Sequence, residues 1–278
     1  MKFFPPELVS EEADGAVENL SETDWEQALH YHDLKKQRLE RSLRDQARAS
    51  AIRGILRKAR ATMGSVTKPY ELKNVSWDLE PSGELDLEGS LEENPALNAL
   101  LVEKKEIRRA ELVLCLDTSL SMTGKKLAIN AVALAVIALQ IEPADLAIIA
   151  FESEATVIKP LGKEMTIQSI LEKFLDVPAR GLTNIEAGLL AAEKECKKGR
   201  LKKRAVILMS DGRHTAGANP ETMVKRLPRM HMVQTGSPWS SPRFCRSLAQ
   251  IGRGKYIRVS QIEQLPKALY SLVHEIIR

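Results

Sequence analysis

Three short polar segments carry the side chains best suited to hold a metal ion. Asp117-Thr118-Ser119-Leu120-Ser121 follows an apolar run over 112–116, and Ser210-Asp211-Gly212 follows another over 205–209. Gly181-Leu182-Thr183-Asn184 precedes a predicted helix that begins at residue 185. Together they offer two carboxylates and several hydroxyls, and hard divalent cations prefer such oxygen ligands. We therefore expect a Mg²⁺ site, for which Mn²⁺ is also suited.

The elements that must position these segments alternate between strand and helix. From residue 110 onward the hydrophobic pattern predicts an α/β fold, with a mostly parallel sheet covered by helices on both faces. In such folds ligands bind at the carboxyl ends of the strands, which is where the polar segments fall. The predicted strands cover 112–116, 145–151, 155–159, 205–209, 230–234 and 255–259. The predicted helices cover 124–139, 166–175, 185–196, 221–227, 243–251 and 262–277.

Two further regions precede this part of the chain. Residues 1–62 are charged and helical in pattern, with acidic residues over 1–26 and basic residues over 35–60. Residues 63–108 form a lead-in, for which we predict a strand over 70–79, an edge strand over 83–88, and then a short helix followed by a charged linker. The first region has few large apolar residues, so we expect it to pack on another surface.

Composition excludes several classes of protein. Of the 278 residues, 44% are apolar and 28% are charged, which is typical of a folded globular chain and not of a disordered one. The 3 cysteines are scattered, which argues against a disulfide scaffold. The longest apolar run, 127–141, is shorter than the roughly 20 residues needed to span a bilayer. The N-terminus has no signal-peptide core, so we expect a cytoplasmic protein.

The three polar segments, in this order, resemble the metal-ion-dependent adhesion site (MIDAS) of von Willebrand factor A (vWA) domains. The resemblance covers residues 110–278, and it places a Rossmann-like vWA domain over 109–278. It implies Ser119, Ser121 and Thr183 as direct metal ligands, with Asp117 and Asp211 acting mostly through bound water. Leu120 departs from the family pattern, because many relatives have glycine there.

The lead-in before the domain is similar to that of CoxE-like and ViaA-like vWA proteins of prokaryotes, which work with MoxR-type AAA+ ATPases. This resemblance implies a non-enzymatic adaptor that uses the metal to bind an acidic side chain of a protein partner. The ATPase would supply nucleotide hydrolysis, because the chain has no GxxxxGK[ST] loop of its own.

Alternative interpretations remain open at the level of sequence. Some vWA domains keep the fold but lack the metal. In that case the roles of Ser119, Ser121 and Thr183 would be to cap helices and form turns. A strand that ends in an aspartate, as at Asp117, is also a feature of Mg²⁺-dependent phosphatases of the haloacid-dehalogenase type. These enzymes need a second acid two residues later, where this chain has Ser119. The basic residues of 35–60 would suit an acidic partner or a nucleic acid, but no aromatic residues interleave with them.

Overall fold

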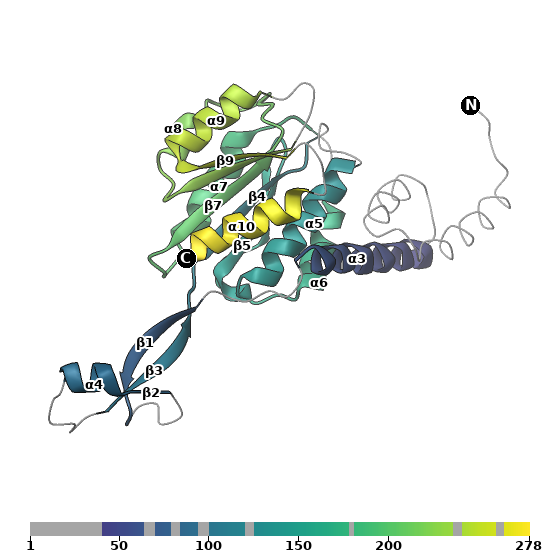
Figure 1. The fold of residues 1–278 in the computed structure, drawn as a ribbon. Helices are drawn as coiled ribbons and strands as arrows, with labels where there is room; N and C mark the ends of the chain where they lie inside the picture. The colour runs from purple at the N-terminus through teal and green to yellow at the C-terminus, as the bar shows by residue number, and fades with distance from the viewer. Residues whose placement is uncertain are drawn as a thin grey trace, which may run out of the picture.

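A six-stranded sheet forms the centre of the C-terminal part of the chain (Figure 1). The computed structural model describes residues 41–63, 70–78, 84–93, 100–119, 125–177, 181–235, 241–259 and 264–278. The strand order is β6-β5-β4-β7-β8-β9, and every neighbouring pair is parallel except β5 with β6. The strands are β4 (Glu111–Asp117), β5 (Leu146–Phe151), β6 (Ala155–Lys159), β7 (Arg204–Ser210), β8 (Met230–Thr235) and β9 (Arg253–Val259).

The central strands are mostly apolar because both faces of the sheet are covered. Every residue of β4, β5 and β8 is buried. Along β4, Leu112, Leu114 and Leu116 pack into one core, whereas Val113 and Cys115 pack into another on the opposite face. This confirms the predicted α/β fold with helices on both faces.

Each core is closed by its own helices. The core that holds Leu114 is covered by α5 (Lys125–Gln140), α6 (Ile167–Asp176), α10 (Leu265–Ile277) and α3 (Arg41–Met63). The core that holds Cys115 is covered by α7 (Ile185–Cys196), α8 (Glu221–Val224) and α9 (Pro242–Ile251). No helix in the described part of the chain is long and apolar enough to cross a membrane.

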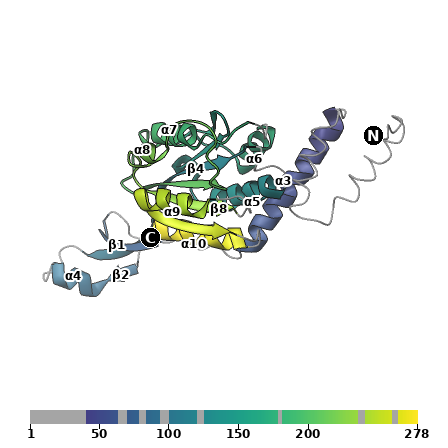
Figure 2. The ribbon, with the colours of Figure 1, turned by 90° about the horizontal axis from the view of Figure 1, so that it is seen from above.

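The basic N-terminal region packs on this same domain through α3. Ala51, Ile55 and Ala59 are each 0% exposed and belong to the core beneath α5 and α10. Arg48 of α3 also pairs with Asp176 of α6 at 3.1 Å. Figures 1 and 2 show α3 lying alongside α5 and α10. The predicted helical pattern is therefore confirmed over 41–63, and the rest of residues 1–62 lies outside the described residues.

The lead-in folds into a separate three-stranded sheet that projects away from the larger one (Figures 1 and 2). Its order is β1-β3-β2 and both pairings are antiparallel. Its elements are β1 (Tyr70–Ser76), β2 (Glu84–Asp86), α4 (Leu87–Glu93) and β3 (Leu101–Ile107).

The prediction of a charged linker here was wrong, because residues 101–107 form the central strand of the small sheet. The middle of this strand shows no alternation of apolar and polar residues, because it consists of Glu103, Lys104, Lys105 and Glu106. The strand is instead stabilised by pairing with β1 along its whole length. The predicted edge strand is present but short, and Leu87 and Glu88 belong to α4 instead.

Candidate metal site

Asp117 and Asp211 come together because their strands are neighbours. β4 and β7 run parallel, with Leu116 level with Met209 in the register. Asp117 is the last residue of β4, and Asp211 follows Ser210, the last residue of β7. Both aspartates are 0% exposed. The fold therefore brings two buried carboxylates to the carboxyl edge of the sheet, where the sequence placed them.

A hydrogen-bond network holds the Asp117 carboxylate in one orientation. Its Oδ1 accepts the backbone N–H of Ser119 at 2.9 Å, and its Oδ2 accepts the hydroxyl of Ser210 at 2.5 Å. The backbone carbonyl of Asp117 accepts from Asn130 Nδ2 of α5 at 2.9 Å. The side chain is thus fixed by the loop that follows it, by the neighbouring strand and by the helix after the loop.

The electrostatics of this edge favour a cation. Burial is the main influence on Asp117 and raises the pKa of its carboxyl to about 6. The hydrogen bonds from Ser119 and Ser210 lower this pKa, whereas the negative charge of Asp211 raises it. A divalent cation held at this end of the sheet would offset both the burial and the repulsion, as metal ions do in carboxylate sites. The described residues contain no cluster of three or more His, Cys, Asp or Glu side chains, so hydroxyl ligands would have to complete such a site.

The Thr183 segment is tied to the segment that follows Asp211. The Thr183 N–H donates to Thr215 Oγ1 at 2.8 Å, and the Thr183 carbonyl accepts the backbone N–H groups of Thr215 and Ala216 at 3.0 and 3.2 Å. Asn184 caps α7 by accepting the N–H of Ala187 at 3.0 Å. Thr183 itself is 3% exposed. The structure thus joins the second and third polar segments of the sequence.

The loop after Asp211 requires a glycine. Gly212 has φ +79°, and a Cβ there would lie 2.2 Å from the sulfur of Cys245. The Gly212 N–H donates to Ser210 Oγ at 3.1 Å, and the N–H of Arg213 donates to Asp211 Oδ1 at 3.1 Å. This tight turn holds the Asp211 carboxylate at the end of β7.

Of the five predicted ligands, the structure describes four. Asp117 accepts hydrogen bonds from Ser119 and from Ser210 of β7. Thr183 is hydrogen-bonded to the loop that follows Asp211. Ser121 lies outside the described residues. His214 is half-buried and stacks on Phe244, with ring centroids 6.3 Å apart, in a surface pocket of about 430 Å³.

Sequence reasoning missed two residues that support the site. Ser210 bonds to Asp117 from the adjacent strand, and Asn130 holds the Asp117 backbone from inside α5. A signal existed for Asn130, because it is a polar residue inside an otherwise apolar helix and is 0% exposed. For Ser210 the only signal was its place at the end of a buried strand beside Asp211.

The comparisons with known proteins agree with this fold. Residues 112–214, which contain Asp117, Ser119, Thr183 and Asp211, match the family model described as von Willebrand factor type A domain. The fold is the vWA fold. No curated protein matches the chain.

Several solved vWA structures are similar to this chain in fold. A conserved hypothetical protein, BatB from Bacteroides thetaiotaomicron, is 19% identical, with 60% of this chain and 98% of that chain covered and a TM-score of 0.51. The manganese-loaded TRAP protein of Plasmodium vivax is 20% identical, with 61% and 74% covered and a TM-score of 0.50. Proximal thread matrix protein 1 from the mussel byssus, with a zinc-occupied MIDAS motif, is 18% identical, with 60% and 48% covered and a TM-score of 0.50.

Proposed function

We propose that this chain is a metal-dependent protein-interaction module. Asp117, Ser119, Ser121, Thr183 and Asp211 would hold Mg²⁺ or Mn²⁺, and an acidic side chain of a partner protein would complete the coordination shell. The observation that carries the proposal is the pair of buried carboxylates, Asp117 and Asp211, at adjacent strand ends. Two structures with the same fold, one with a zinc-occupied MIDAS motif and one loaded with manganese, support a divalent cation.

The chain's own residues would prepare this site for a cation. Ser119 and Ser210 fix the two Asp117 oxygens, so the carboxylate does not have to reorient when the ion arrives. The tight turn at Gly212 fixes Asp211 in the same way. When bound, the ion supplies positive charge and an open coordination position for a carboxylate.

We propose a binding role without catalysis. A phosphatase that used Asp117 as nucleophile would need an acid two residues later, and that position is Ser119, whose backbone N–H bonds to Asp117. An assay of phosphatase activity with Mg²⁺ tests this directly. Turnover that disappears in Asp117→Asn would contradict the binding role.

The finer proposal is an adaptor for a MoxR-type AAA+ ATPase in the cytoplasm. It rests on the order of the parts, since a helical N-terminal segment and a short lead-in precede the vWA fold. The partner would contact the carboxyl edge of the sheet, where the candidate ligands lie. The N-terminal helix α3 is occupied on its apolar side by the domain itself.

Metal binding is tested by calorimetric titration of the EDTA-treated full chain with Mg²⁺ and Mn²⁺. We expect one site, lost in Asp117→Asn and in Asp211→Asn. Glu92→Gln is the matched control, because it removes an exposed acid of α4 in the separate small sheet. Equal binding by all variants would contradict the metal site.

Partner binding is tested separately, with the intact chain and Asp211→Asn as parallel baits for a MoxR-type ATPase in Mg²⁺ buffer. Retention by the intact chain alone supports the metal bridge. Equal retention by both baits would place the contact elsewhere. Binding to nucleic acid through the basic α3 would instead survive EDTA and weaken steeply with salt.

A further inference from the structure

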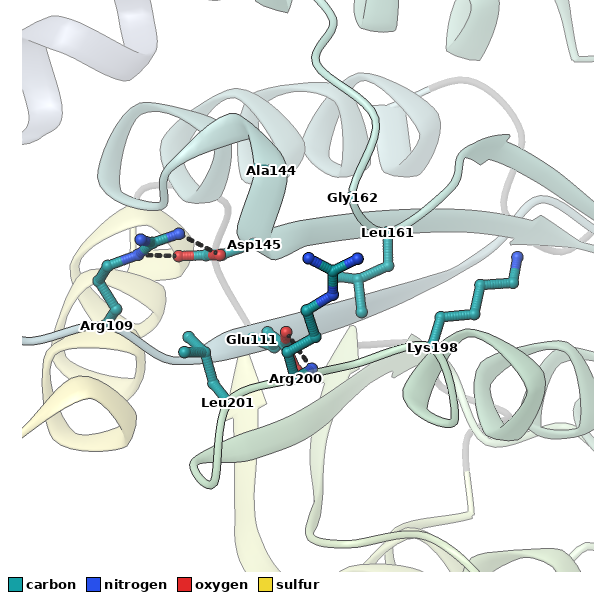
Figure 3. A pocket seen from close by; sticks show the side chains of 9 residues that line it. All are labelled: Arg109, Glu111, Ala144, Asp145, Leu161, Gly162, Lys198, Arg200 and Leu201. Carbon is teal, nitrogen blue, oxygen red and sulfur yellow. Dashed lines mark hydrogen bonds and ion pairs between the residues drawn. The ribbon is translucent and has the colours of Figure 1, made fainter.

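Figure 3 shows a second cavity. It lies at the amino ends of the parallel strands of the large sheet, whereas the candidate metal site lies at their carboxyl ends. Its volume is about 520 Å³, and its walls come from the starts of β4 and β5, the turn after β6 and the loop between α7 and β7. The seven residues of β4 separate it from Asp117, which is roughly 20 Å along a strand. A ligand in this cavity would therefore not touch the candidate metal ligands.

Two carboxylates around this cavity already have partners. Both oxygens of Asp145 accept from the guanidinium of Arg109, at 2.7 Å each. Glu195 pairs with Lys198 at 2.5 Å and accepts the N–H of Leu161 at 2.9 Å. These contacts pair the two carboxylates with a guanidinium, an ammonium and a backbone N–H on two sides of the cavity.

Glu111 is the third acid near the cavity, and the chain covers it. Its Oε1 accepts the backbone N–H of Arg200 at 2.7 Å. Its Oε2 is buried without a hydrogen-bond partner among the described residues, and a Cβ on Gly199 would lie 2.1 Å from it, so the loop backbone closes over this oxygen. Arg204 lies level with Glu111 in the register of β7 and brings a positive charge beside it.

Hydrogen-bond donors are left in excess. Figure 3 shows the Arg200 guanidinium projecting between the Arg109–Asp145 pair and Lys198. Within the described ranges, this exposed guanidinium has no hydrogen-bond or ion-pair partner. Arg109 and Lys198 each retain further N–H groups, because a guanidinium has five and an ammonium has three. Leu161 and Leu201 add apolar wall beside these donors.

We infer that this cavity binds a small phosphorylated molecule, with its phosphate held by the Arg200 guanidinium between the Arg109–Asp145 pair and Lys198. A guanidinium without a partner offers parallel N–H donors that match the oxygens of a phosphate. The cavity volume falls in the range of small-molecule sites, and its leucine side chains offer a surface for the carbon portion of the ligand.

The experiment is a calorimetric titration of the full chain with glycerol 3-phosphate and with inorganic phosphate. The buffer contains EDTA, so that no phosphate binds through a metal ion. We expect both probes to bind at one site, and Arg200→Gln to weaken binding by about tenfold or more, because a charge-assisted hydrogen bond is lost. The backbone N–H of residue 200 remains in this variant, so its bond to Glu111 is retained.

Lys202→Gln is the matched control, since it removes one exposed positive charge from the same loop but does not line the cavity. It should bind both probes as the unmodified chain does, as should Asp211→Asn. Succinate, which carries the same charge in two carboxylates, should bind more weakly than phosphate. The inference is overturned if neither phosphate probe binds, if the two glutamine variants lose affinity equally, or if succinate binds more tightly.

Discussion

The hydroxyl of Ser210 donates to Asp117 Oδ2 at 2.5 Å, and this bond joins the carboxyl ends of β7 and β4. Ser210 also accepts the N–H of Gly212 at 3.1 Å, so one hydroxyl links the Asp117 carboxylate to the turn that holds Asp211. Both aspartates are completely buried. The geometry of the candidate metal site therefore depends on a residue that is not itself a proposed ligand.

Ser210→Ala should weaken Mg²⁺ binding by about tenfold, because the Asp117 carboxylate loses the donor that orients it. It should also lower the free energy of unfolding by about 1–3 kcal/mol, since a buried acceptor is left unsatisfied. Calorimetric titration and urea unfolding measure the two effects. Ser247→Ala, on the partly buried face of α9, is the control and should leave Mg²⁺ affinity unchanged. Unaltered affinity in Ser210→Ala would show that Asp117 needs no such orientation.

Asp117→Asn should have opposite effects on stability with and without metal. In EDTA at pH 7.5 the substitution removes a buried negative charge beside Asp211. We therefore expect the free energy of unfolding to be about 1–2 kcal/mol higher than in the unmodified chain. In saturating Mg²⁺ the unmodified chain should gain stability through ion binding, whereas the variant should not.

The comparison needs only urea unfolding curves of both proteins in the two buffers. A variant that is less stable in EDTA would show that the hydrogen bonds of Asp117 outweigh the cost of its charge. A variant that still responds to Mg²⁺ would show that the ion binds without Asp117.

The sequence predicted the large domain well because its elements have strong and different periodicities. Residues 112–116 of β4 are an unbroken apolar run, and α7 begins after the Asn184 cap and ends at Cys196, as the pattern predicted. The candidate site was predictable for a related reason. Once the strands are known to be parallel, the residues that follow them must meet at one edge.

Other features could not be predicted because they depend on tertiary contacts. β3 is rich in charge, and only its pairing with β1 makes it a strand. The weak amphipathic pattern of α3 did not reveal which surface the helix packs on, because small residues such as Ala51 and Ala59 make its contact with the domain. The cavity beside Arg200 is formed by four chain segments far apart in sequence, which no local pattern reveals.

Ile55→Ala should destabilise the whole domain by about 2–4 kcal/mol. Ile55 is 0% exposed in the core shared by α3, α5 and α10, and shortening a buried isoleucine loses apolar burial and leaves a cavity. Arg53→Ala, on the exposed side of the same helix, should change stability by less than about 0.5 kcal/mol. Urea unfolding of the full chain provides both values. A similarly small effect at Ile55 would show that α3 does not contribute to this core.

His231 should make the protein less stable in acid. It lies in β8, is 1% exposed, and its Nδ1 accepts the backbone N–H of Lys255 at 3.1 Å. Burial, followed by the positive charge of Arg229, lowers the pKa of His231 to about 4. Lys255 also lowers this pKa, whereas Glu275 raises it. The neutral imidazole is therefore the form that fits the fold.

His231→Asn tests this linkage, because the asparagine oxygen can accept the Lys255 N–H without taking up a proton. The folded imidazole resists protonation down to about pH 4, whereas the unfolded one is protonated below about 6.5. Stability from this group is therefore complete above pH 6.5 and is lost as the pH falls toward 4, at up to about 1.4 kcal/mol per pH unit. The raised pKa of Asp117 acts in the opposite direction, so the informative quantity is the difference between variant and unmodified chain at each pH. Urea unfolding at pH 7.5 and pH 5 should show that this difference moves by about 2 kcal/mol in favour of the variant. A difference that stays constant between the two pH values would mean that His231 is accommodated equally well with its proton.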